Sequence, residues 1–402
     1  MYICPENKRR LTAYALLSLG FLFSYIPAAH AGLMDKFIDD DGWVDGSDWV
    51  LDNAVGFMPV PIIITEPAVG EGLGAALAFF HPPKDYSKEE YQEELEQVDR
   101  EGNPKGSEND EFVLPNITVV AAAATNNGSW LVGGGHIAHW KNDTIRFEGM
   151  GGYASVNVNY YLQLPGDQSV PFEFNAEGFL SSLPIAFRLG GSNFFLGGNW
   201  DYSEVETKFD KSFPILEPLN FKSSQSALGI FMRYDSRNTI FTPTKGTYAE
   251  VSYSRESESW GSDWEFDKAE LWVHQYFTLS PKWVLGLRGD IQQVDGELPF
   301  YALPFIELRG IPALRYQGES VALLEGDIAW RFHPRMAING FAGIGKADES
   351  FDDFSDSPSR VTRGLGFRYN AARKLGMWAG IDVAKGPEDT YWYITMGSPW
   401  RD

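Results

Sequence analysis

The chain has 402 residues, a formal net charge of −22 and 41 glycines, with 15% aromatic and only 22% charged residues. A chain this acidic lacks the cationic surface that nucleic-acid binding requires, which excludes that class of partner. The length alone would suit about two soluble domains, but the glycine- and aromatic-rich composition is typical of a transmembrane β-barrel. The predicted fold class is therefore all-β, a transmembrane antiparallel barrel.

The N-terminus has the pattern of a secretory signal peptide. Basic residues 8–10 precede an apolar stretch from about residue 11 to residue 28, and Ala29-His30-Ala31 supplies a small-x-small cleavage site. We therefore expect residues 1–31 to be cleaved; the competing interpretation is a membrane-anchor helix, for which the run is short. The only cysteine, Cys4, lies in this segment, so the exported chain has no thiol for a disulfide or a metal site.

Two segments precede the regular strand pattern. Residues 32–57 form a short acidic lead, and residues 58–402 are the predicted barrel domain. Within the stretch 57–70 three prolines exclude a helix, so we expect extended chain that leads into the first strand. Residues 82–112 are strongly acidic and are predicted to be an extracellular loop.

From residue 72 onward, apolar and polar residues alternate with period two. In the run 283–292, for example, Leu285 and Leu287 fall on one face and Arg288 and Asp290 on the other. One face suits lipid and the other a wet lumen; a soluble β-sandwich would alternate too, but with shorter and fewer strands. The sixteen predicted strands are residues 72–81, 113–124, 129–139, 143–151, 154–163, 172–189, 193–208, 223–236, 246–256, 264–278, 282–293, 320–332, 335–345, 358–370, 375–385 and 390–398. The stretch 143–163 could instead be one long strand.

Tight turns and long loops separate these runs. Turn residues cluster at 126–128, 191–193, 280–282 and 333–335, whereas the intervening connections, such as 209–222, 256–264 and 346–358, are longer and more acidic. Short turns on one side and long loops on the other are typical of an outer-membrane barrel.

The connection between the eleventh and twelfth strands carries the clearest motif. Leu308-Arg309-Gly310-Ile311, followed by Tyr316-Gln317-Gly318, resembles the Val-Arg-Gly-Phe/Tyr motif of the BamA/TamA superfamily of outer-membrane proteins, with Ile311 in place of the aromatic residue. In that family the motif lies in the sixth extracellular loop, which folds into the lumen and meets acidic residues of strands twelve and thirteen. The resemblance implies that Arg309 pairs with lumen-facing Asp327 or Glu325.

Strand thirteen departs from the family. Where relatives have Phe-x-Asp-x-Gly, this chain has Phe341-Ala-Gly343-Ile-Gly345, which shifts the expected pairing toward Asp327. Arg309 could equally serve only to pin the loop as a plug, because a barrel this wide needs something to close it.

Two further stretches extend the resemblance to essentially everything from residue 57 onward. Asp235-Ser-Arg237-Asn238 with Phe241-Thr-Pro-Thr-Lys-Gly246 looks like the family's Asp-x-Arg-(Asn/Asp)…Pro-x-x-Gly element, and Tyr391–Trp400 resembles its C-terminal assembly signal. By resemblance, the barrel would have a weak seam between strands 72–81 and 390–398. The seam-strand residues singled out are Gly72, Gly74, Gly397 and Trp400, and glycine is a poor ladder former.

The sequence offers no catalytic machinery. It has no Gly-x-Ser-x-Gly elbow and no phosphate loop, and His136 and His139, three apart in one strand, face opposite sides and cannot share a metal. We expect no enzyme activity, no cofactor and no metal.

The resemblance implies insertion or translocation of a protein, or of a lipid-linked partner, in the outer membrane of a Gram-negative bacterium. The expected surroundings are outer-membrane lipid and lipopolysaccharide, the expected client is an exported or barrel protein, and the barrel is expected to be monomeric. Relatives carry periplasmic POTRA domains, for which a 26-residue lead is too short. Two alternatives remain open: a passive or gated cation-preferring pore, and a structural surface-antigen barrel.

Overall fold

The computed structural model describes residues 37–39, 42–47, 57–81, 116–141, 143–164, 168–209, 220–373 and 376–400. The predicted signal peptide, residues 1–31, lies outside these ranges. Within them, no helix has both the length and the apolar character needed to cross a membrane.

Almost all of the described chain is β-strand. The strands are β1 (Phe57–Ile64), β2 (Gly72–His81), β3 (Asn116–Thr125), β4 (Trp130–Trp140), β5 (Ile145–Leu164), β6 (Gln168–Ser182), β7 (Ile185–Arg188), β8 (Phe194–Phe209), β9 (Phe221–Asp235), β10 (Gly246–Glu256), β11 (Glu265–Ser280), β12 (Trp283–Glu297), β13 (Ser320–His333), β14 (Met336–Asp348), β15 (Arg360–Ala372), β16 (Met377–Lys385) and β17 (Thr390–Met396). Short 3-10 turns lie in three connections: η5 (Glu258–Trp260), η6 (Phe300–Ala302) and η7 (Phe351–Ser355).

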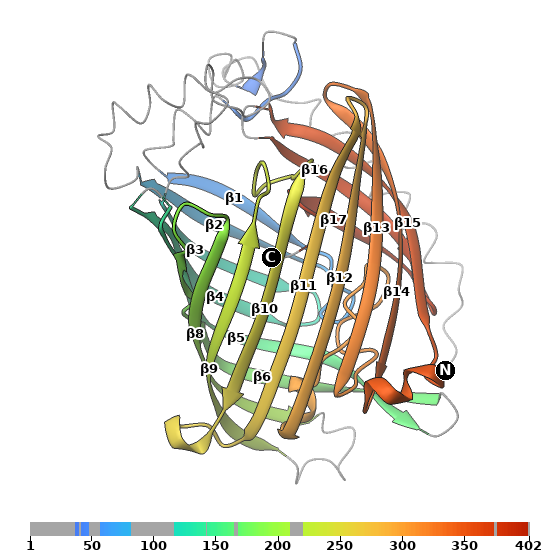
Figure 1. The fold of residues 1–402 in the computed structure, drawn as a ribbon. Coiled ribbons are helices and arrows are strands. Elements are labelled where there is room, and N and C mark those ends of the chain that lie inside the picture. The colour runs from blue at the N-terminus through green and yellow to red at the C-terminus, as the bar shows by residue number, and fades with distance from the viewer. Residues whose placement is uncertain are drawn as a thin grey trace.

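Each strand pairs antiparallel with its neighbours in the chain, and the sheet curls into a barrel (Figure 1). One position is shared: β6 and β7 both lie between β5 and β8. Pro184 separates them because proline has no N–H to give to the ladder. The described strands therefore fill sixteen positions around the barrel.

The strand count matches the prediction, but two strands differ. Residues 57–64, expected only as extended chain, form β1, and the predicted strands 143–151 and 154–163 are the single strand β5, as the alternative allowed. β1 adds one strand to the prediction and β5 removes one. Residues 298–319 therefore still lie between the eleventh and twelfth strand positions, as predicted.

The added strand β1 and the merged strand β5 also change the predicted side of the barrel for each connection between β1 and β5. Connections 210–220, 257–264 and 298–319 share one end, here called the loop end, and the tight connections 189–193 and 334–335 share the other, the turn end. β2 ends and β3 begins at the turn end; residues 82–112, predicted to be an extracellular loop, lie outside the described residues. The turn at 126–128 conversely lies at the loop end.

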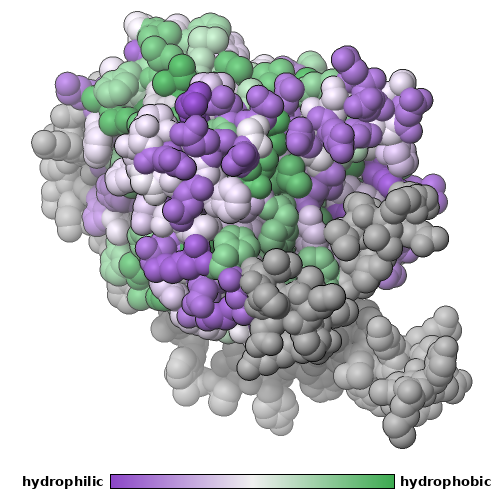
Figure 2. Space-filling view, turned by 90° about the horizontal axis from the view of Figure 1, so that it is seen from below, coloured by the Kyte–Doolittle hydropathy of each residue, from purple (hydrophilic) through white to green (hydrophobic). Residues whose placement is uncertain are grey.

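The alternation of faces is confirmed. On β12, Leu287 and Ile291 are each 44% exposed on the outer surface, whereas Arg288 and Asp290 are buried in the lumen. Apolar side chains cover the outside of the other strands in the same way, including Leu324 of β13 and Leu365 of β15. Figure 2 views the molecule from the end where η5 and η7 lie in Figure 1, and hydrophilic side chains gather on that face.

The described part of the N-terminal lead is fixed to the turn end. Arg335, in the tight connection between β13 and β14, is completely buried. Its Nη1 lies 2.6 Å from Asp45 Oδ2 and its Nη2 lies 2.7 Å from Asp39 Oδ2, and Arg373 also pairs with Asp39. Two carboxylates of the acidic lead therefore neutralise two arginines of the barrel rim.

Candidate functional site

Residues 298–319, here called the inner loop, fold into the barrel lumen and form its largest apolar cluster among the described residues. Ile306, Leu308, Ile311 and Tyr316 are at most 6% exposed, and they pack against Val321 and Leu323 of β13. Removing this apolar surface from water holds the loop inside the barrel.

Strand β14 accommodates the inner loop because it carries glycine where the loop packs. A Cβ atom at Gly343 would lie 2.8 Å from Leu308 Cδ2, and one at Gly345 would lie 2.6 Å from Ile306 Cγ2. Side chains at these positions would displace the loop. The glycine that stands in place of the family's aspartate thus has a packing role in this chain.

Arg309 lies at the centre of a buried ion-pair network. Its Nε donates to Glu325 Oε1 at 2.9 Å, its Nη2 to Asp327 Oδ2 at 2.9 Å and its Nη1 to Asp382 Oδ2 at 2.7 Å. The guanidinium carbon also lies 3.5 Å from the centre of the Phe341 ring. The planar fork of arginine spreads its donors toward all three carboxylates, whereas a lysine ammonium is a compact point charge.

The carboxylates of this network have further donors. Arg368 pairs with Asp382, Asn339 Nδ2 donates to Asp327 at 2.9 Å, and Trp400 Nε1 donates to Glu325 Oε2 at 2.7 Å. Buried charges are tolerated only when they are paired and hydrogen-bonded in this way. The network therefore joins the inner loop to β13, β14, β15 and β16.

The residues around Arg309 are fitted just as closely. Gly310 has a φ of +100°, and a Cβ there would lie 2.9 Å from the backbone nitrogen of Gly386, so glycine is required. Its N–H donates to the Tyr393 hydroxyl of β17 at 2.9 Å. Likewise, a Cβ on Gly318 would come within 2.5 Å of the backbone of Asp348.

The second half of the inner loop reaches the hairpins at both ends of the sheet. Tyr316 donates to Glu388 in the β16–β17 connection, and Arg315 Nη2 lies 3.0 Å from the same carboxylate. The N–H of Ala313 donates to Glu66 Oε1, in the β1–β2 turn, at 3.1 Å. Burial and the bond to Glu388 together raise the pKa of Tyr316 above its ordinary value.

The first half of the inner loop rests on the opposite wall at the loop end. Phe300 packs its ring against Tyr160 of β5, Phe174 of β6 and Phe209 of β8, with centroid distances of 4.8, 5.1 and 6.0 Å. The inner loop therefore crosses the lumen and has anchors on both sides.

The structure brings Arg309 together with both expected partners, Glu325 and Asp327. It adds Asp382 of β16, which no sequence motif connects with Arg309. Seventy-three positions separate the two residues, and only the position of β16 around the barrel brings them together. Period two alone could have nominated Asp382 as a lumen carboxylate, but not its partner.

The predicted seam is wrong in one of its strands. Both edges of β2, which holds Gly72 and Gly74, are occupied, one by β1 and the other by β3. The ladder of described pairs ends instead at β1 and at β17. Between them, Ile394 N donates to Thr65 Oγ1 at 3.4 Å, just outside β1.

The prolines of β1 explain why its free edge pairs weakly. Pro59 and Pro61 are two residues apart, so both nitrogens point to the same edge. Proline is tolerated in a ladder only where no donor is needed, which is the edge away from β2. The edge that faces β17 therefore lacks two donors.

Trp400 does not belong to the seam. β17 ends at Met396, and Gly397, with a φ of +78°, turns the chain inward. Trp400 is then 3% exposed in the lumen, where its ring packs on Tyr276 and His274 of β11. The aromatic C-terminus thus closes part of the turn end from the inside.

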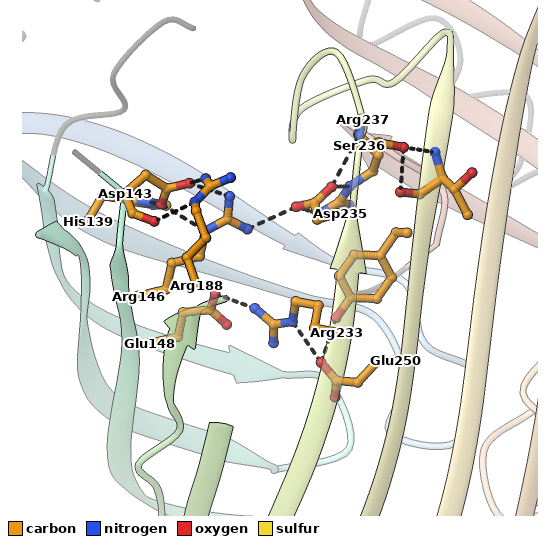
Figure 3. Close-up of polar contacts among 12 residues, drawn as sticks. His139, Asp143, Arg146, Glu148, Arg188, Arg233, Asp235, Ser236, Arg237 and Glu250 are labelled. Atoms are coloured by element: carbon orange, nitrogen blue, oxygen red, sulfur yellow. Dashed lines mark hydrogen bonds and ion pairs between the residues drawn. The ribbon is translucent and has the colours of Figure 1, made fainter. Parts of the chain in front are cut away.

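A second ionic cluster lines the lumen near the turn end (Figure 3). Arg146 lies 2.6 Å from Asp143 and 3.0 Å from Asp235, while Arg188 and His139 also contact Asp143. Although burial alone raises it, hydrogen bonds from His139 and Arg146 hold the pKa of the Asp143 carboxyl well below its ordinary value.

The same cluster includes the motif residues Asp235 and Arg237. Arg237 Nε donates to Asp235 Oδ1 at 3.0 Å, and Arg233, two residues before Asp235, bridges Glu148 at 3.0 Å and Glu250 at 2.7 Å. These pairs join β4, β5, β7, β9 and β10, so the Asp-x-Arg element acts as a rigid tie across this half of the barrel.

Histidines of β4 point to opposite sides, as expected from the strand period. His136 bonds to Thr118 at 2.9 Å on the outer surface, whereas His139 contacts Asp143 in the lumen. In the described ranges no group of three or more His, Cys, Asp and Glu residues could hold a metal ion.

Residues 147–306 match the Omp85 superfamily domain. This match covers 160 of the 402 residues. The matched region runs from β5 to the first half of the inner loop, and so includes the Asp-x-Arg element. Comparison with curated proteins finds no match.

Solved structures show the same fold at low sequence identity. The crystal structure of BamA from Haemophilus ducreyi lacking POTRA domains 1-3 is 12% identical, with a TM-score of 0.52, and the match covers 92% of this chain and 82% of that one. CdiB from Escherichia coli is 12% identical, with a TM-score of 0.53 and coverage of 84% and 62%. CdiB from Acinetobacter baumannii is 11% identical, with a TM-score of 0.52 and coverage of 85% and 59%. The likeness shows the fold, which in this chain is a β-barrel of about sixteen strands with an inward-folded loop.

Proposed function

We propose that this Omp85 barrel inserts or translocates a protein, or a lipid-linked partner, at the outer membrane of a Gram-negative bacterium, after export with a cleaved signal peptide. The observation that carries the proposal is the set of inner-loop contacts. Arg309 ties the loop to β13 and β16, and the following residues contact Tyr393 of β17, Glu388 and Glu66.

These contacts would couple the loop to the seam. Glu66 belongs to the β1–β2 turn, and Glu388 to the β16–β17 connection. One loop therefore contacts the hairpins on both sides of the weak edge, and its displacement would release both. A plug that only blocked the lumen would not need to hold these two hairpins together.

The test is depletion of the protein in its own host. We expect a defined set of outer-membrane or secreted proteins to be lost while bulk permeability stays unchanged, and the wild-type gene to restore that set. An unchanged proteome would contradict the proposal.

A second candidate function, a cation-preferring pore, is favoured by one cavity. A lumen cavity of about 470 Å³ lies under the inner loop against β8–β12. Its lining includes Asp201, Glu256, Glu270 and Glu307 against the single basic residue Lys268, and such a surface favours cations. Altered uptake of small cations on depletion, with an intact proteome, would support this function instead.

A further inference from the structure

One part of the lumen wall is apolar, which is unusual for the inside of a transmembrane barrel. Figure 3 shows Arg146 and Glu148 of β5 pointing toward Arg233 and Asp235 of β9, across the lumen. Met150, two residues after Glu148, shares that inner face and is 61% exposed. A large apolar side chain is thus open to the inside of the barrel.

Neighbouring strands continue this apolar wall. Met150 pairs with Gly135 of β4 and Ser182 of β6, so the inner face of those strands follows from the register. On that face Ile137 and Leu131 of β4 are 39% and 40% exposed, and Leu180 of β6 is 49% exposed. All four large apolar residues remain half open to the lumen.

Small residues form a furrow between these four apolar side chains. One cross-strand row consists of Ala121 of β3, Gly133 of β4, Gly152 of β5 and Leu180 of β6. Its glycines form a floor without side chains, and Leu131 and Ile137 border it along β4. Three strand spacings give it a length of about 14 Å.

The inner loop leaves this furrow uncovered. The apolar cluster of the loop packs against β13, on the other side of the barrel. Phe300 touches β5 and β6 only nearer the loop end, at Tyr160 and Phe174. The furrow therefore lies between that aromatic contact and the ionic cluster of Figure 3.

We propose that this furrow binds the acyl chain of a membrane phospholipid inside the barrel. The floor consists of strand backbone whose N–H and C=O groups pair in the ladder, and the borders are hydrocarbon, so the site offers no hydrogen bonds to an extended polypeptide. A hydrocarbon chain needs none. The row continues through Ala76 of β2 to Val60 of β1, the strand at the weak edge, where bilayer lipid is adjacent.

The test uses the absence of cysteine after residue 4. Met150→Cys is labelled with a bimane fluorophore in the full-length protein, and the barrel is placed in lipid nanodiscs that contain phospholipid with a nitroxide on its acyl chain. We expect saturable quenching at position 150. Ser252→Cys, on the polar wall of the same lumen, is the matched control and should not be quenched, whereas Leu287→Cys on the outer surface should be.

A second variant probes the furrow directly. Leu180→Asp should weaken quenching at position 150 about tenfold, because it places a charge where about two methylene groups would pack. Since Leu180 is half exposed, the variant should still fold and keep the heat-modifiable gel migration of a barrel.

The inference would be overturned by no quenching at position 150, by equal quenching at positions 150 and 252, or by relief of quenching with an apolar peptide but not with unlabelled phospholipid. Quenching by free spin-labelled fatty acid alone would reject membrane phospholipid as the source. Binding is measured without any transport, so failure here leaves the proposed translocation function untouched.

Discussion

At the scale of single residues, Arg309 has the most demanding environment in the lumen. Its side chain is 8% exposed and contacts three carboxylates, one of them fully buried Asp382. A buried ion pair adds little net stability over apolar packing, but removing one partner leaves the others uncompensated. Mutation of Arg309 should therefore lower the free energy of unfolding measurably.

We expect Arg309→Ala to lower the free energy of unfolding by roughly 3–5 kcal/mol, because buried Glu325 and Asp382 and half-buried Asp327 lose their shared cation. Arg309→Lys should recover only part of that loss, since an ammonium group is a compact point charge without the planar fork that reaches the three carboxylates. Urea unfolding in detergent micelles, followed by tryptophan fluorescence, measures both. Lys208→Ala, which removes an exposed pair with Glu206, is the control and should change nothing measurable. Equal stability of wild type and Arg309→Ala would show that the network is dispensable.

Period two predicts which carboxylates face the lumen, but not which of them meet. Glu325 and Asp327 are close to Arg309 in sequence, and their strand follows the inner loop directly, so local reasoning could nominate them. The contacts of Asp382, Trp400 and Glu388 depend on the curvature of the whole barrel and on an inward turn at Gly397. No local pattern encodes that geometry.

At the scale of elements, the inner loop has two independent anchors. Aromatic packing at Phe300 holds its first half to β5–β8, and ion pairs at Arg309 hold its second half to β13–β16. The first anchor is apolar and the second ionic, so the two should respond differently to mutation.

We expect Phe300→Ala to free the first half of the inner loop while the Arg309 network keeps the second half in place. Several ring contacts, each worth about 0.5–1.5 kcal/mol, are lost at once. Hydrogen exchange should rise by about tenfold or more in residues 298–303 but not in 308–316. Phe351→Ala, which removes the Phe351–Phe354 contact in another loop-end connection, is the matched control and should leave the inner loop protected. Uniform exchange along the loop would mean that it moves as one unit.

Element boundaries were predictable wherever the alternation was regular. β1 was not predicted as a strand because Pro59 and Pro61 argue against a central strand, although both fit an edge strand. β5 was split because the period-two signal weakens at its centre, around the glycine pair at 151–152. Each error has a physical cause in one or two residues.

At the scale of the whole molecule, those two errors cancel for every connection after β5, including the inner loop, but not for the connections between β1 and β5. A barrel alternates its ends with every strand, so one missing strand reverses the side of each connection until a second error restores the count. The end of the barrel at which the β3–β4 turn lies therefore could not be obtained without β1. The fold class, by contrast, depends only on the repeated alternation and was secure.

The weak edge between β1 and β17 makes a prediction for the complete barrel. Thr65→Cys with Ile394→Cys should form a disulfide across the seam, because Ile394 N already lies 3.4 Å from Thr65 Oγ1 and the chain has no native cysteine after residue 4. If transport requires this edge to open, the oxidised barrel should lose the client proteins that depletion removes, and a reductant should restore them. The control is Ile338→Cys with Phe367→Cys, directly opposed within the continuous β14–β15 ladder, where a disulfide should have no effect. Full activity of the oxidised Thr65–Ile394 pair would show that the barrel works closed, and clients would then have to pass through the lumen past the inner loop.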